Sequence, residues 1–355
     1  MIWRLLGRDL ITTYHSLNPT TITELTSDPS PLEFMRHVSL NRPFIIRGGA
    51  TTWPSYQKWT STYLANTLTN TPVNVALTPQ GNADSILPLP SHPTTHALFI
   101  KPHETHLPFT TVLHHIRTQH LSTPPGTKPL GPILYAQTQN DNLRNEYRTL
   151  FSDCPSSIPF ARIALEKDPD AINLWIGNAF STTALHKDNY ENIYVQIRGR
   201  KHFTLLPPVE SPCVNEKNVL SATYTPEKSE IPITTDAGDL DGVRLRPTVD
   251  EPRSYTPFCM WDPDVPDVNA TRFSELSRPL KVTLDEGDML YLPALWYHKV
   301  QQSCNEEGIC VAVNYWYDLE FSGGFWSMAN FVRAAGLVVG GEDDARIKSR
   351  GMNEE

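Results

Sequence analysis

Proline is the feature of this sequence that most constrains its fold. The chain has 31 prolines among 355 residues, nearly twice the share of roughly 5% in an average protein. Because proline interrupts helix interiors, long helical bundles and coiled coils are excluded. Hydrophobic residues make up 39% of the chain and aromatic residues 10%, which is enough to form a core and excludes wholesale disorder. We therefore expect a β-rich fold with many turns and long surface loops.

Charge, hydropathy and cysteine usage limit the partners and the setting. Lys and Arg total 30 against 39 Asp and Glu, so the formal net charge is −9, and a net basic field that coats nucleic acid is excluded. No apolar run approaches the roughly 20 residues that span a bilayer, so no membrane partner is expected. The five cysteines are odd in number and contain no C-x-x-C pair, which disfavours a disulfide framework and a thiolate zinc site. We expect a reducing compartment, the cytoplasm or the nucleus.

The pattern of the sequence changes near residue 130. Residues 1–130 read as a helix and loop region, with helical spacing over 53–68 and 109–120, and we expect this region to pack on the core. Residues 131–320 instead carry short strand-like runs separated by turns. Short antiparallel strands at this spacing are typical of a jelly roll or a barrel. The predicted fold class is therefore mainly β with added helices (α+β).

Two segments stand apart from the short strands. Residues 209–280 are polar and proline-rich, and they are too long for an ordinary connection, so we expect a partly structured functional excursion. Residues 321–355 contain an amphipathic helix candidate, Phe325 to Val339, which is also a candidate for dimerisation. Between two of the strand-like runs, Gly199-Arg200 suits a two-residue hairpin turn with glycine first.

The run Leu185-His186-Lys187-Asp188 carries the first chemical signal. In a strand, residues i and i+2 point to the same side, so His186 and Asp188 would face one point together. His298, at the edge of a later strand pair, is the candidate third ligand. Two imidazoles and one carboxylate form the facial triad of non-haem Fe(II) oxygenases, which leaves positions open for a co-substrate and O₂. A solvated polar face is the ordinary explanation of His-x-Asp, but these residues lie within hydrophobic strand sequence, where an unpaired His or Asp would be costly.

Lys201 carries the second signal, because it opens a strand-like run from Lys201 to Leu205 soon after the His-x-Asp run. A lysine aimed into a barrel needs an anion, and the distal carboxylate of 2-oxoglutarate would serve. Thr183, three residues before His186, and Tyr194, on the strand before Lys201, could help to hold it. A surface lysine beside a turn is the more common outcome for this residue type, so the functional interpretation depends on the triad.

Together these motifs resemble those of the JmjC (Jumonji C) family of Fe(II)- and 2-oxoglutarate-dependent oxygenases. The matching strings are NRPFIIRG (41–48), NLWIG (173–177), TALHKDNYEN (183–192), GRKHF (199–203), GDMLYLPALWYH (287–298) and AVNYWY (312–317). They cover most of residues 30–320. Within the family, the strings HKDNYEN and LPALWYH are similar to those of a lysyl hydroxylase subgroup.

The resemblance implies a set of site residues. His186, Asp188 and His298 would be the catalytic residues and the ligands of Fe(II), with 2-oxoglutarate and O₂ as co-substrates. Six residues would line the 2-oxoglutarate pocket, with the lysine pairing with the carboxylate: Lys201, Thr183, Tyr135, Tyr194, Asn192 and Asn314. The resemblance also implies a double-stranded β-helix core and a homodimer built partly on C-terminal helices.

The resemblance also suggests a substrate. Members of the lysyl hydroxylase subgroup hydroxylate a lysine in developmentally regulated GTP-binding proteins of the translation-factor class, so such a protein is the implied partner. The loops at 70–110 and 209–280 would frame the substrate cleft. In the second loop, Asp262, Asp264 and Asp267 could attract a cationic substrate side chain.

Three alternatives are open at the level of sequence. The same chemistry acting on a methyl group would make an N-methyl-lysine demethylase of histones or other proteins, although we find no zinc-finger cysteine pattern. An RNA hydroxylase is the second alternative, and the acidic balance of the chain offers it little support. The third is a non-enzyme, a cupin-like binding protein, against which the intact triad and Lys201 both argue.

Overall fold

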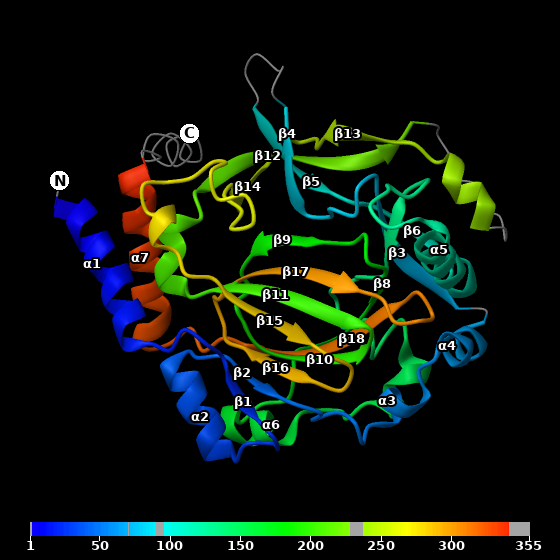
Figure 1. Cartoon of the computed structure of the whole chain (residues 1–355), viewed down its shortest axis with the longest axis horizontal. Coiled ribbons are helices and arrows are strands. Elements are labelled where there is room, and N and C mark those ends of the chain that lie inside the picture. Colours follow the sequence, from blue (N-terminus) through cyan, green and yellow to red (C-terminus); the bar gives the residue numbers. More distant parts are fainter. Residues whose placement is uncertain (1, 70, 90–95, 228–236, 341–355) are drawn as a thin grey trace.

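Two β-sheets form the core of the structure, a computed structural model that describes residues 2–69, 71–89, 96–227 and 237–340 (Figure 1). The larger sheet has, in spatial order, β1 (Thr23–Leu25), β2 (Phe44–Ile46), β16 (Met289–Leu292), β10 (Tyr190–Arg198), β18 (Cys310–Asp318) and β8 (Ala171–Gly177). The smaller sheet has β15 (Leu280–Leu284), β11 (Arg200–Leu206), β17 (Tyr297–Ser303) and β9 (Thr183–His186). Apart from the parallel β1–β2 pair, neighbouring strands in these sheets are antiparallel.

The two sheets share a layer of side chains. Tyr194 and Leu290 of the larger sheet pack with Phe203, Leu205 and Leu284 of the smaller one in one buried cluster. Both sheets also line a single cavity. Burial of this apolar layer is the main force that holds one sheet against the other. The predicted α+β class with a jelly-roll-like core is confirmed.

A further sheet is built from the predicted loop segment 70–110 and the excursion at 209–280, which we expect to be partly structured. Its strand order is β13 (Leu245–Val249), β12 (Glu216–Pro226), β5 (Ala97–Lys101) and β4 (Ser85–Pro88), with β14 (Tyr255–Cys259) also paired to β12. The excursion at 209–280 supplies β12, β13 and β14, whereas β4 and β5 come from 70–110. In Figure 1 this sheet lies above β9. A three-stranded sheet, β6 (His103–Pro108), β3 (Pro72–Thr78) and β7 (Ile133–Tyr135), lies next to it.

Helices pack around the sheets. The α-helices of the described residues are α1 (Ile2–Leu17), α2 (Pro31–Leu40), α3 (Pro54–Lys58), α4 (Ser61–Thr67), α5 (Phe109–Ser122), α6 (Pro159–Leu165) and α7 (Gly324–Gly340). The helices predicted over 109–120 and 325–339 are confirmed as α5 and α7, whereas α1 was not predicted, and the helix predicted over 53–68 is divided into α3 and α4. In the described part of the chain, no helix has the length and hydrophobicity needed to cross a membrane.

The hairpin predicted at Gly199-Arg200 is wrong. β10 ends at Arg198 and β11 begins at Arg200, but β10 pairs with β16 and β18, while β11 pairs with β15 and β17. Gly199 has a φ of +69°, and a Cβ there would lie 2.5 Å from the carbonyl oxygen of Ser303. Only glycine permits this sharp turn from one sheet to the other. The turn places Lys201 in the sheet opposite β10.

Helix α2 links the N-terminal region to the core. Ser30 caps its start, since the Ser30 side chain accepts from the Glu33 N–H at 3.2 Å and the Glu33 carboxylate accepts from the Ser30 N–H at 2.8 Å. Asn41 ends the helix in a left-handed conformation, with a φ of 48°. The Asn41 side chain then donates to the carbonyl oxygen of Ala294 at 3.0 Å, in the turn that leads into β17.

Candidate metal and co-substrate site

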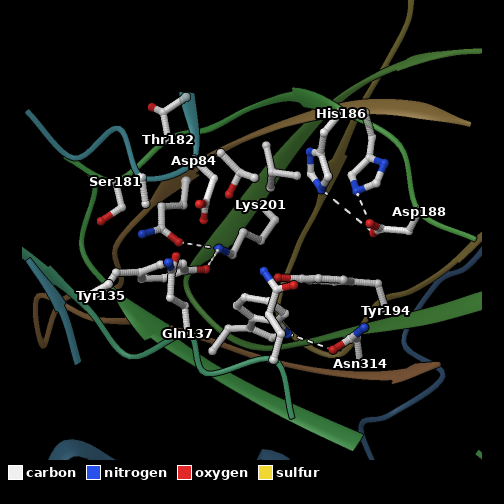
Figure 2. Close-up of a pocket in the computed structure, with 18 of the residues that line it drawn as sticks. Asp84, Tyr135, Gln137, Ser181, Thr182, His186, Asp188, Tyr194, Lys201 and Asn314 are labelled. Atoms are coloured by element: carbon white, nitrogen blue, oxygen red, sulfur yellow. Dashed lines mark hydrogen bonds and ion pairs between the residues drawn. The ribbon is translucent and has the colours of Figure 1, made fainter. Parts of the chain in front are cut away.

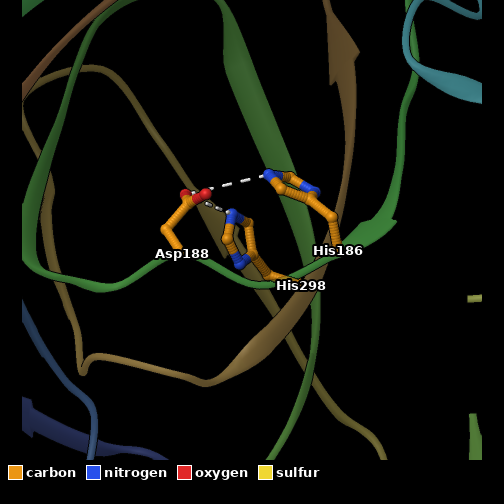
Figure 3. Close-up of side chains that lie close together, drawn as sticks. All are labelled: His186, Asp188 and His298. Atoms are coloured by element: carbon orange, nitrogen blue, oxygen red, sulfur yellow. Dashed lines mark ion pairs between the residues drawn. The ribbon is translucent and has the colours of Figure 1, made fainter. Parts of the chain in front are cut away.

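Three predicted ligands converge at one point between the sheets (Figure 3). His186, the last residue of β9, lies opposite His298 of β17 in the antiparallel pair, and the two ring centroids are 4.1 Å apart. Asp188 lies beyond the end of the strand. The predicted strand alternation therefore does not place it beside His186, and the segment that follows β9 does so instead. Its Oδ2 lies 3.8 Å from Nε2 of His186 and 3.6 Å from Nε2 of His298. One donor atom from each residue lies within 4.8 Å of the other two, close enough to share one ion.

Backbone carbonyls fix the tautomer of both rings. Nδ1 of His186 lies 2.8 Å from the carbonyl oxygen of Ala184. Nδ1 of His298 likewise lies 3.1 Å from the carbonyl oxygen of Trp296. A carbonyl oxygen only accepts hydrogen bonds, so each Nδ1 carries the proton and each Nε2 presents its lone pair toward Asp188. Burial, with a contribution from His186, lowers the pKa of His298 to about 4, so this ring is neutral at physiological pH, the form that binds a metal.

Lys201 occupies another part of the same cavity (Figure 2). Lys201 is 3% exposed, and its Nζ donates to the Tyr135 hydroxyl at 2.9 Å and to the side-chain oxygen of Gln302. Burial raises the pKa of the Tyr135 and Tyr194 phenols, although Lys201 opposes the shift, so both phenols are neutral. Among the described residues, no carboxylate pairs with Lys201. A buried ammonium without a counter-charge is costly, so this part of the cavity needs an anionic ligand.

The structure brings every predicted site residue to one cavity of about 530 Å³. These residues are Tyr135, Thr183, His186, Asp188, Asn192, Tyr194, Lys201, His298 and Asn314. The two asparagines belong to a hydrogen-bonded chain, in which Trp175 Nε1 donates to Asn314 Oδ1 at 2.8 Å and Asn314 Nδ2 donates to Asn192 Oδ1 at 3.1 Å. Both side chains are therefore oriented by the protein itself.

Comparisons with known proteins agree with this geometry. The family described as cupin-like domain matches residues 29–323. The human protein named bifunctional peptidase and (3S)-lysyl hydroxylase JMJD7 is 37% identical over 325 residues, which cover 90% of this chain and 92% of that protein. The Arabidopsis thaliana protein named lysine-specific demethylase JMJ32 is 34% identical over 311 residues, 85% of this chain and 83% of that protein. The Dictyostelium discoideum JmjC domain-containing protein E is 32% identical over 309 residues, 84% of each chain.

The chain belongs to the JmjC family. Members of this family are cupin-like 2-oxoglutarate oxygenases that depend in general on Fe(II) and 2-oxoglutarate. The resemblance seen in the sequence motifs is therefore confirmed, and so is the prediction that the chain is an enzyme of this class.

The donor set of this JmjC site fits a ferrous ion. Two imidazoles and one carboxylate are the ligands that non-haem Fe(II) oxygenases use. Both Nε2 atoms and the Asp188 carboxylate face a common point. The hydrogen bonds from Nδ1 of each ring are the outer-shell contacts that fix the orientation of a metal-binding histidine. The residues present therefore suit the metal on which the family depends.

The cavity also fits a polar co-substrate, because three of its residues contain buried polar atoms without a partner. The Thr138 and Ser181 hydroxyls and the Trp316 indole nitrogen have no hydrogen-bond partner among the described residues, and all three residues line the cavity. Each unpaired buried group costs about 1–3 kcal/mol. Polar groups of bound molecules would relieve this cost. Together with Lys201, these atoms suit a dicarboxylate such as 2-oxoglutarate and a polar substrate beside it.

Among the lining residues that sequence reasoning missed are Gln302, Ser181 and Asp84. Gln302 follows His298 by four residues on β17, so the strand period of two places both side chains on one face. That signal was available in the sequence. Ser181 and Asp84 lie in loops, where no period indicates the direction of a side chain.

The acidic cluster of the long excursion does not face this cavity. Lys299 Nζ lies 2.7 Å from Asp262 Oδ2 and 2.8 Å from Asp264 Oδ2, and Lys281 Nζ lies 3.0 Å from Asp264 Oδ1. Neither aspartate lines the cavity. Asp267 does not line it either. The hypothesis that Asp262, Asp264 and Asp267 attract a cationic substrate is therefore not supported, because none of the three lines the cavity and lysines of the protein compensate the charge of the first two.

A buried carboxylate holds the turn that carries His298. Glu191 of β10 is 5% exposed, and it accepts from the Tyr291 hydroxyl at 2.6 Å and from the Ala294 N–H at 3.1 Å. Burial raises the pKa of Glu191. The sequence string HKDNYEN thus contains two of the candidate metal ligands and also the acceptor that fixes the segment of the third candidate, His298.

The same turn is held from two further sides. The Leu295 N–H donates to the carbonyl oxygen of Asp188 at 2.9 Å, and Trp296 Nε1 donates to Asn41 Oδ1 at 2.7 Å. Leu295 has a φ of 67°, a left-handed conformation that a leucine rarely adopts. Such a conformation persists where the surroundings determine it, and here the contacts join the turn to Asp188 and to the end of α2.

We predict that Glu191→Ala lowers the free energy of unfolding by about 2–4 kcal/mol, because two buried donors lose their acceptor. Urea unfolding of the metal-free protein, followed by circular dichroism, measures the loss. Glu191→Gln keeps one acceptor oxygen and should lose less than half as much. Equal stability of Glu191→Ala and the wild type would contradict the bracing role.

Proposed function

We propose that the chain is an Fe(II)- and 2-oxoglutarate-dependent dioxygenase that hydroxylates a lysine side chain of another protein. The observation that carries this proposal is the single cavity shared by the His-Asp-His set and the buried, uncompensated Lys201. A ligand set alone would also suit a cupin-like binding protein. The buried ammonium of Lys201 adds a positive charge that would pair with the carboxylate of a co-substrate.

Each charged residue of the cavity has a role in this proposal. His186, Asp188 and His298 would hold Fe(II) through two Nε2 atoms and one carboxylate. Bound Fe(II) would activate O₂, which is the oxidant both for the conversion of 2-oxoglutarate to succinate and CO₂ and for the hydroxylation of an unactivated C–H bond. Lys201, supported by the Tyr135 hydroxyl, would pair with the distal carboxylate of 2-oxoglutarate.

The uncharged residues would orient the co-substrate and exclude water. Thr183, Asn192 and Asn314 offer polar groups to the cavity, and Tyr194 lies beside them. Phe203 and Val300 line it as well and would keep water from the reacting groups. The protein contributes position and environment, and the metal with its co-substrate contributes the reactivity.

The substrate assignment rests on the relatives. The human relative is named a (3S)-lysyl hydroxylase, and by analogy we propose a lysine in a translation-factor-type GTPase, a developmentally regulated GTP-binding protein. The Arabidopsis thaliana relative is named a lysine-specific demethylase, so removal of a methyl group from lysine is the second candidate. Both reactions place a lysine side chain beside the metal.

We predict that the protein, with Fe(II), ascorbate and 2-oxoglutarate, adds one oxygen atom to a lysine in a segment of such a GTP-binding protein. Tandem mass spectrometry locates the added oxygen. Asp188→Ala removes the only anionic ligand of the metal and should reduce the product to background.

The control for this assay is Asp264→Ala, which removes an aspartate outside the cavity and should leave the product unchanged. Succinate formation without an added oxygen would reject the proposed target and keep the oxygenase. Loss of a methyl group from an N-methylated version of the segment, with no oxygen added to the unmodified one, would favour the demethylase. Undiminished product with Asp188→Ala would contradict the role of the triad.

We also propose that the protein is a homodimer in the cytoplasm or the nucleus. Helices α1 and α7 lie side by side at one edge of the molecule (Figure 1). Both keep large apolar side chains exposed, among them Leu6 at 50% and Met328 at 64%, and a second copy of the chain would bury such surface. All five cysteines are free thiols, which suits a reducing compartment.

We predict that the wild type has twice the chain mass in light scattering after gel filtration. The double variant Leu6→Glu/Met328→Glu should have the mass of one chain, since two charges would enter the interface. Leu32→Glu, at a residue of α2 that is 68% exposed, is the matched control and should remain dimeric. A dimer that withstands the double variant would place the interface elsewhere.

A further inference from the structure

The charged side chains of the cavity are unevenly distributed. Beyond the metal ligand, Asp84 and Glu104 add two carboxylates to its lining. Asp84 interacts electrostatically with His186, Glu104 and Lys101, whereas Lys201 donates to Tyr135 and Gln302. Figure 2 shows Asp84 among the side chains that line the cavity. The cavity therefore has one region suited to an anion, at Lys201, and another suited to a cation, at Asp84.

Contacts with the segment before β9 hold the loop that carries Asp84 in place. The carbonyl oxygen of Gly81 accepts from the Thr182 N–H at 2.8 Å. Gly81 has a φ of +71°, and a Cβ there would lie 1.9 Å from the carbonyl oxygen of Phe180, so only glycine allows this approach. Asp84 has a φ of 48°, a conformation that Asp and Asn adopt more readily than other residues with a side chain. The loop is thus fixed against the segment that leads into β9.

The Asp84 carboxylate is not compensated by the protein. It has no hydrogen-bond or ion-pair partner among the described residues. Lys101, a cation near it, is paired with Asp250 at 2.7 Å. Burial raises the pKa of Asp84, as expected for a carboxylate that loses water without gaining a donor. Ser181, which is 5% exposed, offers a second acceptor in this lining, because its buried hydroxyl has no hydrogen-bond partner among the described residues.

We propose that Asp84 selects the target side chain by accepting hydrogen bonds from a primary ammonium group, with the Ser181 hydroxyl as a neutral acceptor and Glu104 adding negative potential. This inference rests on the proposed hydroxylase function and names its substrate class, a protonated unbranched alkylamine such as an unmodified lysine. A primary ammonium brings three N–H donors. An acylated lysine has no charge, and a trimethylated lysine keeps its charge but has no N–H, so neither would donate a charge-assisted hydrogen bond to Asp84.

The test measures binding of minimal probes without turnover. The protein is loaded with Mn(II) and 2-oxoglutarate in the absence of O₂, and the broadening of side-chain proton resonances by Mn(II) gives the Kd. The probes are Nα-acetyl-lysine methylamide and its norleucine and trimethyl-lysine counterparts. We expect the wild type to bind the lysine probe at least about tenfold more tightly than either counterpart, the effect of one charge-assisted hydrogen bond.

Asp84→Asn is the decisive variant, because Asn tolerates the same left-handed backbone and removes only the charge. It should bring the Kd values for the lysine and norleucine probes to within about twofold of each other. Glu275→Gln removes one charge from an exposed residue outside the cavity and should keep the preference. A preserved preference in Asp84→Asn, or no preference in the wild type, would overturn the proposal.

This experiment separates the inference from the proposed function. A lysine preference that depends on Asp84 supports the cation site even if the mass spectrum shows no added oxygen. Conversely, hydroxylation of the target lysine by a protein whose Asp84→Asn variant still prefers the lysine probe would keep the function and reject Asp84 as the selecting residue.

Discussion

The antiparallel pairing of β9 with β17 is the constraint on which the site depends. It places His186 opposite His298, and the turn after β9 then brings Asp188 to both rings. Alternation along β17 carries the same face onward to Gln302, which contacts Lys201. One strand pair therefore connects the metal ligands to the residue that would bind the co-substrate, and a change in its register would disperse both.

The cavity contains two charged side chains, Lys201 and Asp84, that form no ion pair with any residue that the structure describes. A buried ammonium at Lys201 and an unpaired carboxylate at Asp84 both reduce the stability of the unliganded fold. Natural proteins commonly accept such costs at functional sites. Here the two charges have opposite sign and lie in different regions of one cavity, so each can be satisfied by a different ligand. Under our proposals, this separation of charge would allow one cavity to bind an anionic co-substrate and a cationic side chain in different places.

The sequence was most informative where the chemistry is local. The candidate metal ligands could be identified because an i, i+2 pair and a later histidine lie in hydrophobic strand sequence, and Lys201 because a buried lysine requires an anion. Contacts across distant segments were not predictable in this way. The pairing of β12 with β5 joins 209–280 to 70–110, and the turn at Gly199 leads into a different sheet. Tertiary packing, and not local propensity, determines both the strand pairing and the path of the turn. Asp84 was missed for the same reason, since only the contact between its loop and the segment before β9 brings it to the cavity.

The central claim is that the triad and Lys201 form one composite site for a metal and 2-oxoglutarate. Calorimetric titration of 2-oxoglutarate into the Mn(II)-loaded protein tests it most directly, with Lys201→Met as the variant, since Met keeps most of the apolar stem and removes the charge. We predict that 2-oxoglutarate binds the wild type only when the metal is present, and that Lys201→Met weakens binding by about 2–5 kcal/mol. Equal affinity of the wild type and Lys201→Met, or equal affinity with and without metal, would contradict the account.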